Sequence, residues 1–121
     1  GNSEALAFGR RKLRIKTAEY HGSKPPAGTI AHECFDAAKI GGAIVLRFWQ
    51  PGDRYRAIGL GGWVKLQDAF TNAKVSVEER RIRLVAESAE KREIFWVEGL
   101  RISETFKLEE GTQQCLFWHW Q

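Results

Sequence analysis

Residues 46–73 read LRFWQPGDRYRAIGLGGWVKLQDAFTNA, and they contain a strand pattern, a turn and a helix pattern with almost no spacer between them. The strand pattern begins slightly earlier, at Ala43, and runs to Trp49 with apolar residues at alternate positions. Such alternation is typical of a strand with one buried face. The sequence therefore predicts a strand at 43–49 whose buried face is formed by Ile44, Leu46 and Phe48.

A tight turn is predicted directly after this strand, at Pro51 and Gly52. Proline presets the first central position of a turn and glycine accepts the positive φ of the second, while the carboxylate of Asp53 accepts hydrogen bonds from nearby backbone amides. We expect this turn to project Arg54 and Arg56 from a fixed base. A glycine-rich loop follows at Gly59, Gly61 and Gly62.

Two short helices are predicted next. From Val64 the apolar residues recur at spacings of three and four, and Asp68 lies on the polar side of this amphipathic helix. Ser76 and Glu79 have the spacing of a capping box, so a second helix should begin at Val77. Its last turn carries basic residues, which the helix dipole favours there. These residues are Arg80, Arg81 and Arg83.

The flanking segments read mainly as strands. Leu84–Glu87 and Glu93–Val97 predict a hairpin, and Arg101–Leu108 and Gln114–Trp120 predict two more strands. Strands at Arg10–Lys16 and Thr29–Phe35, and one helical turn capped by Asp36, complete the pattern. Strands outnumber helices and the helices are grouped in mid-chain, so the expected fold class is α+β.

Length and composition indicate the number of domains, the location and whether a metal site is expected. The 121 residues, 43% of them hydrophobic, favour one domain with one core, at 12–121, preceded by a tag remnant or interdomain linker at 1–11. Neither an export signal nor an 18-residue apolar run occurs, which makes the cytoplasm the expected location and excludes a membrane partner. The chain has two cysteines without zinc-site spacing and three scattered histidines, so free thiols and no metal are expected.

The net charge of +4 and the pI near 9.3 are compatible with a polyanionic partner, but charge of this size is weak support by itself. Lys12, Arg14 and Lys16 are expected to face outward from the first basic strand, either as an ordinary solvated face or as a strip that contacts phosphates. Most of the five tryptophans are expected in the core, with Trp63, among glycines, the candidate for ligand contact.

Several short motifs occur in a fixed order: VLRFWQPGDRY at 45–55, then Gly59, KLQDAF at 65–70, AKV at 73–75 with Arg80, and IFWVEGLRI at 94–102. Gly-Asp-Arg alone is a weak signal, but the combination is specific. In order and spacing these motifs resemble the C-terminal domain of bacterial tRNA(Ile)-lysidine synthetase, over roughly residues 29–108.

The resemblance implies a small β-sandwich-like domain with a mid-chain helical pair, similar to a module of the phenylalanyl-tRNA synthetase β subunit. In that family the parent enzyme uses ATP and lysine to convert the wobble cytidine of tRNA(Ile) to lysidine, and the C-terminal domain engages the acceptor stem. The implied partners are therefore tRNA and the catalytic domain of the same parent chain. The implied tRNA-binding residues are Arg54, Arg56, Lys65, Arg80 and Arg81, with Gly52, Asp53 and Asp68 as turn or structural residues.

Catalysis is not expected of this chain. It lacks the Ser-Gly-Gly-x-Asp-Ser loop with which an adenylating enzyme holds pyrophosphate, so neither a catalytic residue nor a cofactor is expected in it and ATP belongs to the parent enzyme. Asp53 and Asp68 are a weak acid–base candidate, since turn and helix chemistry explains both. Two alternatives remain open: Arg54 bridges Asp53 or Asp68 inside the fold, or the whole chain is an interdomain structural module without RNA contact.

Overall fold

The computed structural model describes residues 3–8, 11–20, 32–57, 59, 61–100 and 103–121. The chain divides into two compact units, one formed by residues 1–39 with 106–121 and the other by residues 40–105. The sequence favoured one domain around one core, and it offered no feature that marks this division. Strands dominate and helices are few, so the predicted α+β class is confirmed.

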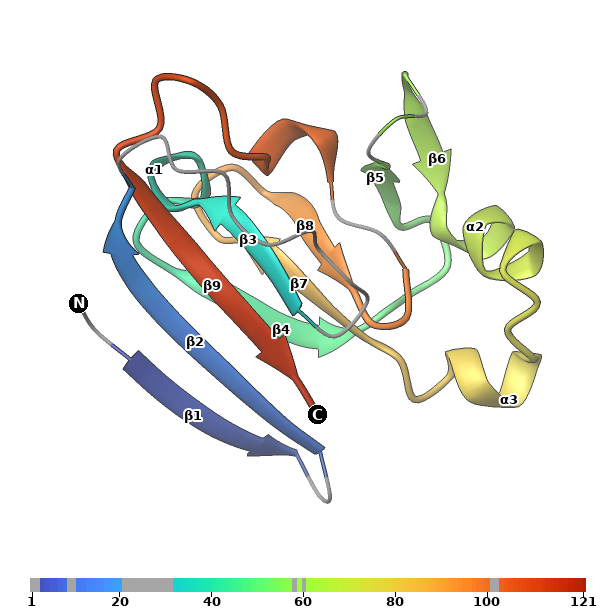
Figure 1. The fold of residues 1–121 in the computed structure, drawn as a ribbon. Helices are drawn as coiled ribbons and strands as arrows, with labels where there is room; N and C mark the ends of the chain where they lie inside the picture. The colour runs from blue at the N-terminus through green and yellow to red at the C-terminus, as the bar shows by residue number, and fades with distance from the viewer. Residues whose placement is uncertain (1–2, 9–10, 21–31, 58, 60, 101–102) are drawn as a thin grey trace. The chain divides into compact units, whose positions relative to one another are not determined.

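The first unit is built on a four-stranded antiparallel sheet in the order β1-β2-β9-β3 (Figure 1). Its strands are β1 (Ser3–Phe8), β2 (Arg11–Glu19), β9 (Gln114–Trp120) and β3 (His32–Asp36). The short helix α1 (Ala37–Ile40) follows β3 directly. Asp36 caps this helix, since its Oδ1 accepts hydrogen bonds from the amides of Ala38 and Lys39 at 3.0 and 3.3 Å.

One face of this sheet is apolar and buried. Leu13 of β2 and Trp118 of β9 lie on it, and Trp118 packs edge-on against Phe35 of β3 at 6.1 Å between ring centroids. Trp118 and Trp120 share this face, as the alternation of β9 predicts. Burial of such aromatic side chains is the main source of stability for a sheet of this size.

The second unit contains a three-stranded antiparallel sheet in the order β4-β7-β8 and a two-stranded ribbon, β5-β6. The sheet strands are β4 (Ile44–Phe48), β7 (Leu84–Ser88) and β8 (Glu93–Val97), and the ribbon strands are β5 (Arg54–Arg56) and β6 (Trp63–Lys65). Helix α2 (Leu66–Asn72) continues from β6, and α3 (Val77–Arg80) follows it (Figure 1). The 3₁₀ helix η1 (Glu104–Phe106) comes after β8.

The core of this unit joins the ribbon, α2 and the sheet. Leu66 and Phe70, one turn apart on α2, are fully buried against Tyr55 of the ribbon and Val85 and Val97 of the sheet. The spacing of three and four that predicted α2 is therefore its buried face. The Ser76 cap is also confirmed, because its Oγ accepts a hydrogen bond from the Glu79 amide at 3.1 Å.

Some predictions were wrong in detail. Arg101–Leu108 is not a strand in its described part, where η1 forms with Phe106 fully buried. The Oγ of Ser103 accepts a hydrogen bond from the Thr105 amide at 3.2 Å, a local bond that competes with strand pairing. In β4, Phe48 was expected on the buried face but is 53% exposed. Residues 3–8 form β1 and pair with β2; that residues 1–11 are a tag remnant or linker stays a prediction.

The start of the predicted strand Thr29–Phe35 lies outside the described residues. Both cysteines are free thiols, as the sequence predicts. Helices in the described part of the chain are all too short to cross a membrane.

Candidate functional site

A turn at Gln50–Asp53 connects β4 to the ribbon. The Asp53 amide donates a hydrogen bond to the Gln50 carbonyl at 3.0 Å, and Gly52 has a φ of +97°, as the second central position of a type II turn requires. The Asp53 carboxylate accepts a further bond from the Gln50 amide at 2.7 Å. On the other side, the Asp53 carbonyl accepts a bond from the Leu66 amide at 2.9 Å. Asp53, the residue before Arg54, is thus fixed to Gln50 and to the start of α2.

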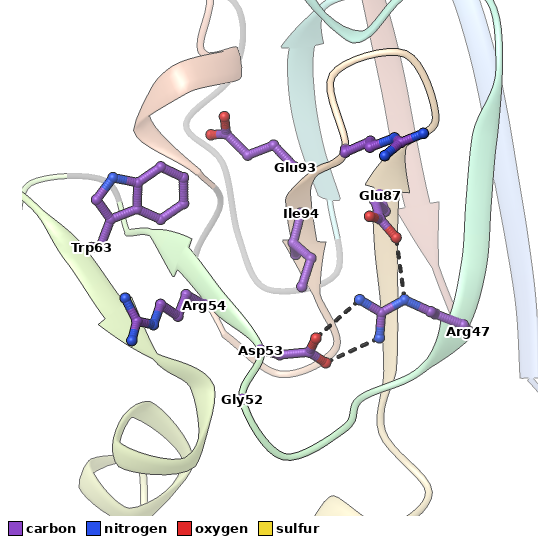
Figure 2. Close-up of a pocket in the computed structure, with 9 residues that line it drawn as sticks. Arg47, Gly52, Asp53, Arg54, Trp63, Glu87, Glu93 and Ile94 are labelled. Carbon is purple, nitrogen blue, oxygen red and sulfur yellow. Dashed lines mark hydrogen bonds and ion pairs between the residues drawn. The ribbon is translucent and has the colours of Figure 1, made fainter.

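Arg47 of β4 binds the same carboxylate. Its Nη1 and Nη2 each lie 3.0 Å from one oxygen of Asp53, and its Nε lies 3.2 Å from Oε1 of Glu87 (Figure 2). Nη1 also donates to the Phe48 carbonyl at 3.2 Å. The hydrogen bond to Asp53 raises the pKa of Arg47 above its ordinary value. We call Arg47, Asp53 and Glu87 the turn cluster; in it a bidentate ion pair locks the turn.

The ribbon presents a cationic face. Arg54 lies directly opposite Lys65 in the register, and Arg56 directly opposite Trp63. Directly opposed residues of an antiparallel pair point to the same side, as do residues two apart on one strand. Arg54, Arg56, Trp63 and Lys65 therefore share one side, and we call them the ribbon face. The other side carries Tyr55, which is buried in the core.

Trp63 is the aromatic member of this face and is 56% exposed. The guanidinium carbon of Arg56 lies 5.9 Å from the centre of its ring. The Nε of Arg56 is buried and has no acceptor within the described chain, which leaves a donor unsatisfied beside the indole. An exposed indole beside a guanidinium offers a stacking surface and positive charge together.

A cleft of about 400 Å³ opens between the ribbon and the strand β8. In Figure 2, Arg54 and Trp63 lie together on one wall, and the Arg54 side chain points away from the carboxylate of Asp53. The turn cluster lies on the opposite wall with its charges already paired. The bridge from Arg54 to Asp53, one of the alternatives that the sequence left open, is made instead by Arg47.

The other two predicted cations lie elsewhere. Arg80, the last residue of α3, and Arg81, which follows it, line a separate cleft of about 460 Å³, together with Trp49, Pro51 and Gln67. Arg80 is held within the fold, since its Nη2 donates to the Val75 carbonyl at 2.8 Å and its guanidinium carbon lies 5.9 Å from the centre of the Phe70 ring. Arg81 is exposed. The structure thus brings together three of the five predicted residues.

Sequence reasoning missed Arg47. A signal for it existed, because a single arginine within the apolar run Val45–Trp49 needs an anionic partner when its strand packs against a core. Asp68 was expected to be structural, and it lies exposed in the first turn of α2, where the helix dipole favours an acidic residue. In the described ranges no three His, Cys, Asp or Glu side chains gather in an arrangement that could hold a metal ion.

Comparisons with known proteins all indicate the same family. The model of the TilS substrate C-terminal domain family matches residues 44–120. The tRNA(Ile)-lysidine synthase of Caldanaerobacter subterraneus subsp. tengcongensis is 42% identical over 83 residues, which cover 68% of this chain and 17% of that protein. That of Clostridium acetobutylicum is 40% identical over 83 residues, again 68% of this chain and 17% of the relative.

A crystal structure of a TILS C-terminal domain has the same fold. It superposes with a TM-score of 0.82 at 25% identity and covers 98% of this chain and 89% of that chain. The architecture thus defines the class, an α+β domain with the fold of that C-terminal domain. The chain belongs to the TilS substrate C-terminal domain family. It spans about a sixth of the length of the relatives it matches, 17% in both cases above.

Proposed function

We propose that this chain is the tRNA-binding C-terminal domain of a tRNA(Ile)-lysidine synthetase and that it engages the acceptor stem through the ribbon face. In the proposed parent enzyme a separate ATP-dependent ligase domain converts the wobble cytidine of tRNA(Ile) to lysidine. That domain would hold the ATP and would be the intramolecular partner of this one. The cytoplasm, where tRNA is modified, is the proposed location.

The observation that carries the proposal is the register of the ribbon. It places Arg54 and Lys65 side by side on an exposed surface, and neither has a carboxylate partner in the described chain. The turn cluster meanwhile fixes the backbone next to Arg54, so less conformational entropy is lost when the Arg54 guanidinium binds a ligand. Phosphates of an RNA helix are ligands of matching charge, and a closed RNA helix is recognised mainly through its backbone and shape.

Trp63 would favour binding at a part of the tRNA where a base is free to stack. Its indole cannot stack on bases that are already paired and stacked within a helix, but it can stack on a base at a helix end or in an unpaired segment. An acceptor stem has such an end, and the cations of the ribbon face would lie against the adjoining phosphates. The family membership and the names of the relatives support tRNA as the partner.

Binding of three RNAs to the 121-residue chain tests the proposal. They are full-length tRNA(Ile), a minihelix with its acceptor stem, and a hairpin with its anticodon stem and loop. We expect the minihelix to bind nearly as well as the tRNA and the anticodon hairpin to bind more weakly. Arg54→Gln and Lys65→Gln should each flatten the slope of log affinity against log salt by roughly 0.7 to 0.9, as the loss of one phosphate contact does.

Lys91→Gln is the matched control, because Lys91 is exposed and lies outside the ribbon face. Its slope should stay close to that of the wild type. If the chain binds none of the three RNAs at low salt, the proposal is wrong and the interdomain structural module becomes the better account. Equal affinity for both hairpins would remove the acceptor stem from the proposal and leave general RNA binding.

A further inference from the structure

The first unit carries a second cationic surface on the exposed side of its sheet. The register aligns Arg14 of β2 with His119 of β9, and His119 with His32 of β3. One row further along, Lys16 lies opposite Phe117. These residues share one side of the sheet with Lys12, whereas Leu13 and Trp118 lie on the buried side. We call the following set the sheet face: Lys12, Arg14, Lys16, His32, Phe117 and His119.

The charge of the sheet face is not neutralised by its neighbours. Lys12, Arg14 and Lys16 are exposed and have no ion pair within the described chain. Strand β1 contributes the small residues Ala5 and Ala7 opposite Arg14 and Lys12, and these cannot cover the cations. Three positive charges therefore follow one another along β2 at spacings of about 6.6 to 6.8 Å.

The acidic groups on this side of the described sheet do not offset that charge. Asp36 is buried, caps α1 and accepts a hydrogen bond from the Thr112 hydroxyl at 2.8 Å. Burial, with Cys115 and Glu33 nearby, raises the pKa of the Cys34 thiol to about 11, so this thiol stays neutral at physiological pH. Among the described residues on this side of the sheet, the exposed charged side chains are the cations Lys12, Arg14 and Lys16.

Rings lie beside the row of cations. The imidazoles of His32 and His119 are stacked, with centroids 4.0 Å apart and planes inclined by 30°. Phe117 is half-buried in the adjacent row of the same strand as His119. Neighbouring strands lie about 4.7 to 4.9 Å apart, so the charges on β2 and the rings on β9 and β3 form two parallel tracks.

We propose that the sheet face binds an unpaired RNA segment that runs along β2, with its phosphates on Lys12, Arg14 and Lys16 and its bases on the rings of His32, Phe117 and His119. Two tracks, one cationic and one of flat rings, match the two sides of a single nucleic-acid strand. An antiparallel sheet with exposed rings is a surface on which unpaired bases stack. An acidic protein segment would use the cations but would leave the rings without a matching partner.

This inference goes beyond the proposed function, because it concerns another surface and a single strand instead of a stem. It does not depend on the ribbon face. Where one RNA carries both a stem and an unpaired segment, contacts at two surfaces of one chain would add to its affinity if both can engage it together.

The first test measures binding of fluorescein-labelled hexaadenylate and hexauridylate to the 121-residue chain. Lys12→Gln combined with Lys16→Gln should weaken binding about tenfold at low salt and flatten the salt slope by roughly 1.4, the value for two contacts with a single strand. The matched control combines Lys74→Gln with Lys91→Gln, which changes the net charge equally at exposed positions elsewhere. The control should stay within about twofold of wild type. Equal losses in both double variants, or no loss in either, would overturn the proposal.

The second test uses the histidine pair. Partial burial, together with the neighbouring His32 and Arg14, lowers the pKa of His119 below its ordinary value. This imidazole is therefore mostly neutral at pH 7 and gains its charge only in more acidic solution. The charged groups nearby on the same side of the described sheet are the cations Lys12, Arg14 and Lys16. Binding of hexauridylate, whose bases do not gain protons in this range, should tighten from pH 7.5 to pH 5.5 in the wild type.

His32→Gln combined with His119→Gln should remove most of that pH dependence, and melting curves will verify that the variant is folded. If the affinity of the folded variant still rises toward pH 5.5 as it does in the wild type, the rings are not part of the site and the proposal is wrong. Binding of a hexamer duplex more tightly than of single strands would also contradict it.

Different results would contradict the ribbon-face proposal and the sheet-face proposal. Arg54→Gln combined with Lys65→Gln should weaken binding of the acceptor minihelix and leave hexauridylate binding unchanged. If the sheet-face variant has normal hexauridylate binding while the ribbon variant loses the minihelix, this inference is wrong and the proposed function stands. If hexauridylate binding falls in the ribbon variant instead, the single strand binds there and this inference is again wrong.

Discussion

Arg47 and Arg54 stand before and after the same turn, and their side chains have opposite surroundings. Arg47 is bound by Asp53, Glu87 and a backbone carbonyl, and its side chain is 27% exposed. Arg54 is exposed on the ribbon face and faces Lys65, another cation. An arginine becomes structural when a turn brings a carboxylate back to it, and the same turn can leave the next arginine available for a ligand.

The largest effect is expected from Arg47→Ala. This change leaves the carboxylates of Asp53 and Glu87 without their shared cation, and both are mostly buried at 13% and 22% side-chain exposure. Loss of one partner from a largely buried ion pair should lower the free energy of unfolding by about 2 kcal/mol. Urea unfolding would measure this, with Arg54→Ala as the matched control at less than about 0.5 kcal/mol. Similar losses in both variants would show that Arg47 is no more structural than Arg54.

A second contrast is expected at the C-terminal end of α3, between Arg80 and Arg81. Arg80→Ala removes the hydrogen bond to the Val75 carbonyl, which fixes the link between α2 and α3, and should cost about 1 to 1.5 kcal/mol. Arg81→Ala should leave stability unchanged within about 0.5 kcal/mol, because Arg81 is exposed. Thermal melts of the two variants are the measurement. A structural Arg80 should also leave the salt slope of tRNA binding near its wild-type value, and a flatter slope would place Arg80 at the RNA interface.

The smallest effect is expected at the start of the same helix. Ser76→Ala removes the acceptor for the Glu79 amide and should lower stability by about 1 kcal/mol or slightly less, since α3 is short and exposed. Ser76→Asp keeps a capping oxygen and should restore most of the loss. If Ser76→Ala and Ser76→Asp have the same urea midpoint, the cap contributes nothing and α3 is positioned by Arg80 alone.

Much of this arrangement could be predicted from local patterns. The turn followed from Pro51 and Gly52, the cap from Ser76 and Glu79, and the first helix from its apolar spacing. Each of these signals depends only on residues close in the sequence, so it can be recognised in a single sequence. The capping box was only half right, because Glu79 pairs with Arg83 at 3.4 Å instead of returning to the Ser76 amide.

The ribbon face could be predicted only in part. That Arg54 and Arg56 share a side follows from their separation by two residues in a strand. That Lys65 joins them depends on the register across the glycine-rich loop, which no local pattern determines. The strand β6 itself was missed, because the helix pattern was expected to begin at Val64 and Trp63 was assigned to the glycine-rich loop.

The strand β8 contains one residue more than its ladder with β7 requires. Val97 pairs with Val85 and Ile94 with Glu87, so Phe95 is the extra residue of a bulge, and Ile94 and Val97 both belong to the same core despite their odd separation. A chain that lacked Phe95 could keep all four pairings between these strands and would lose one buried aromatic ring. Deletion of a residue from β7 would instead move Val85 to the opposite side of the sheet. Differences in length among homologous chains should therefore be more frequent in β8 than in β7.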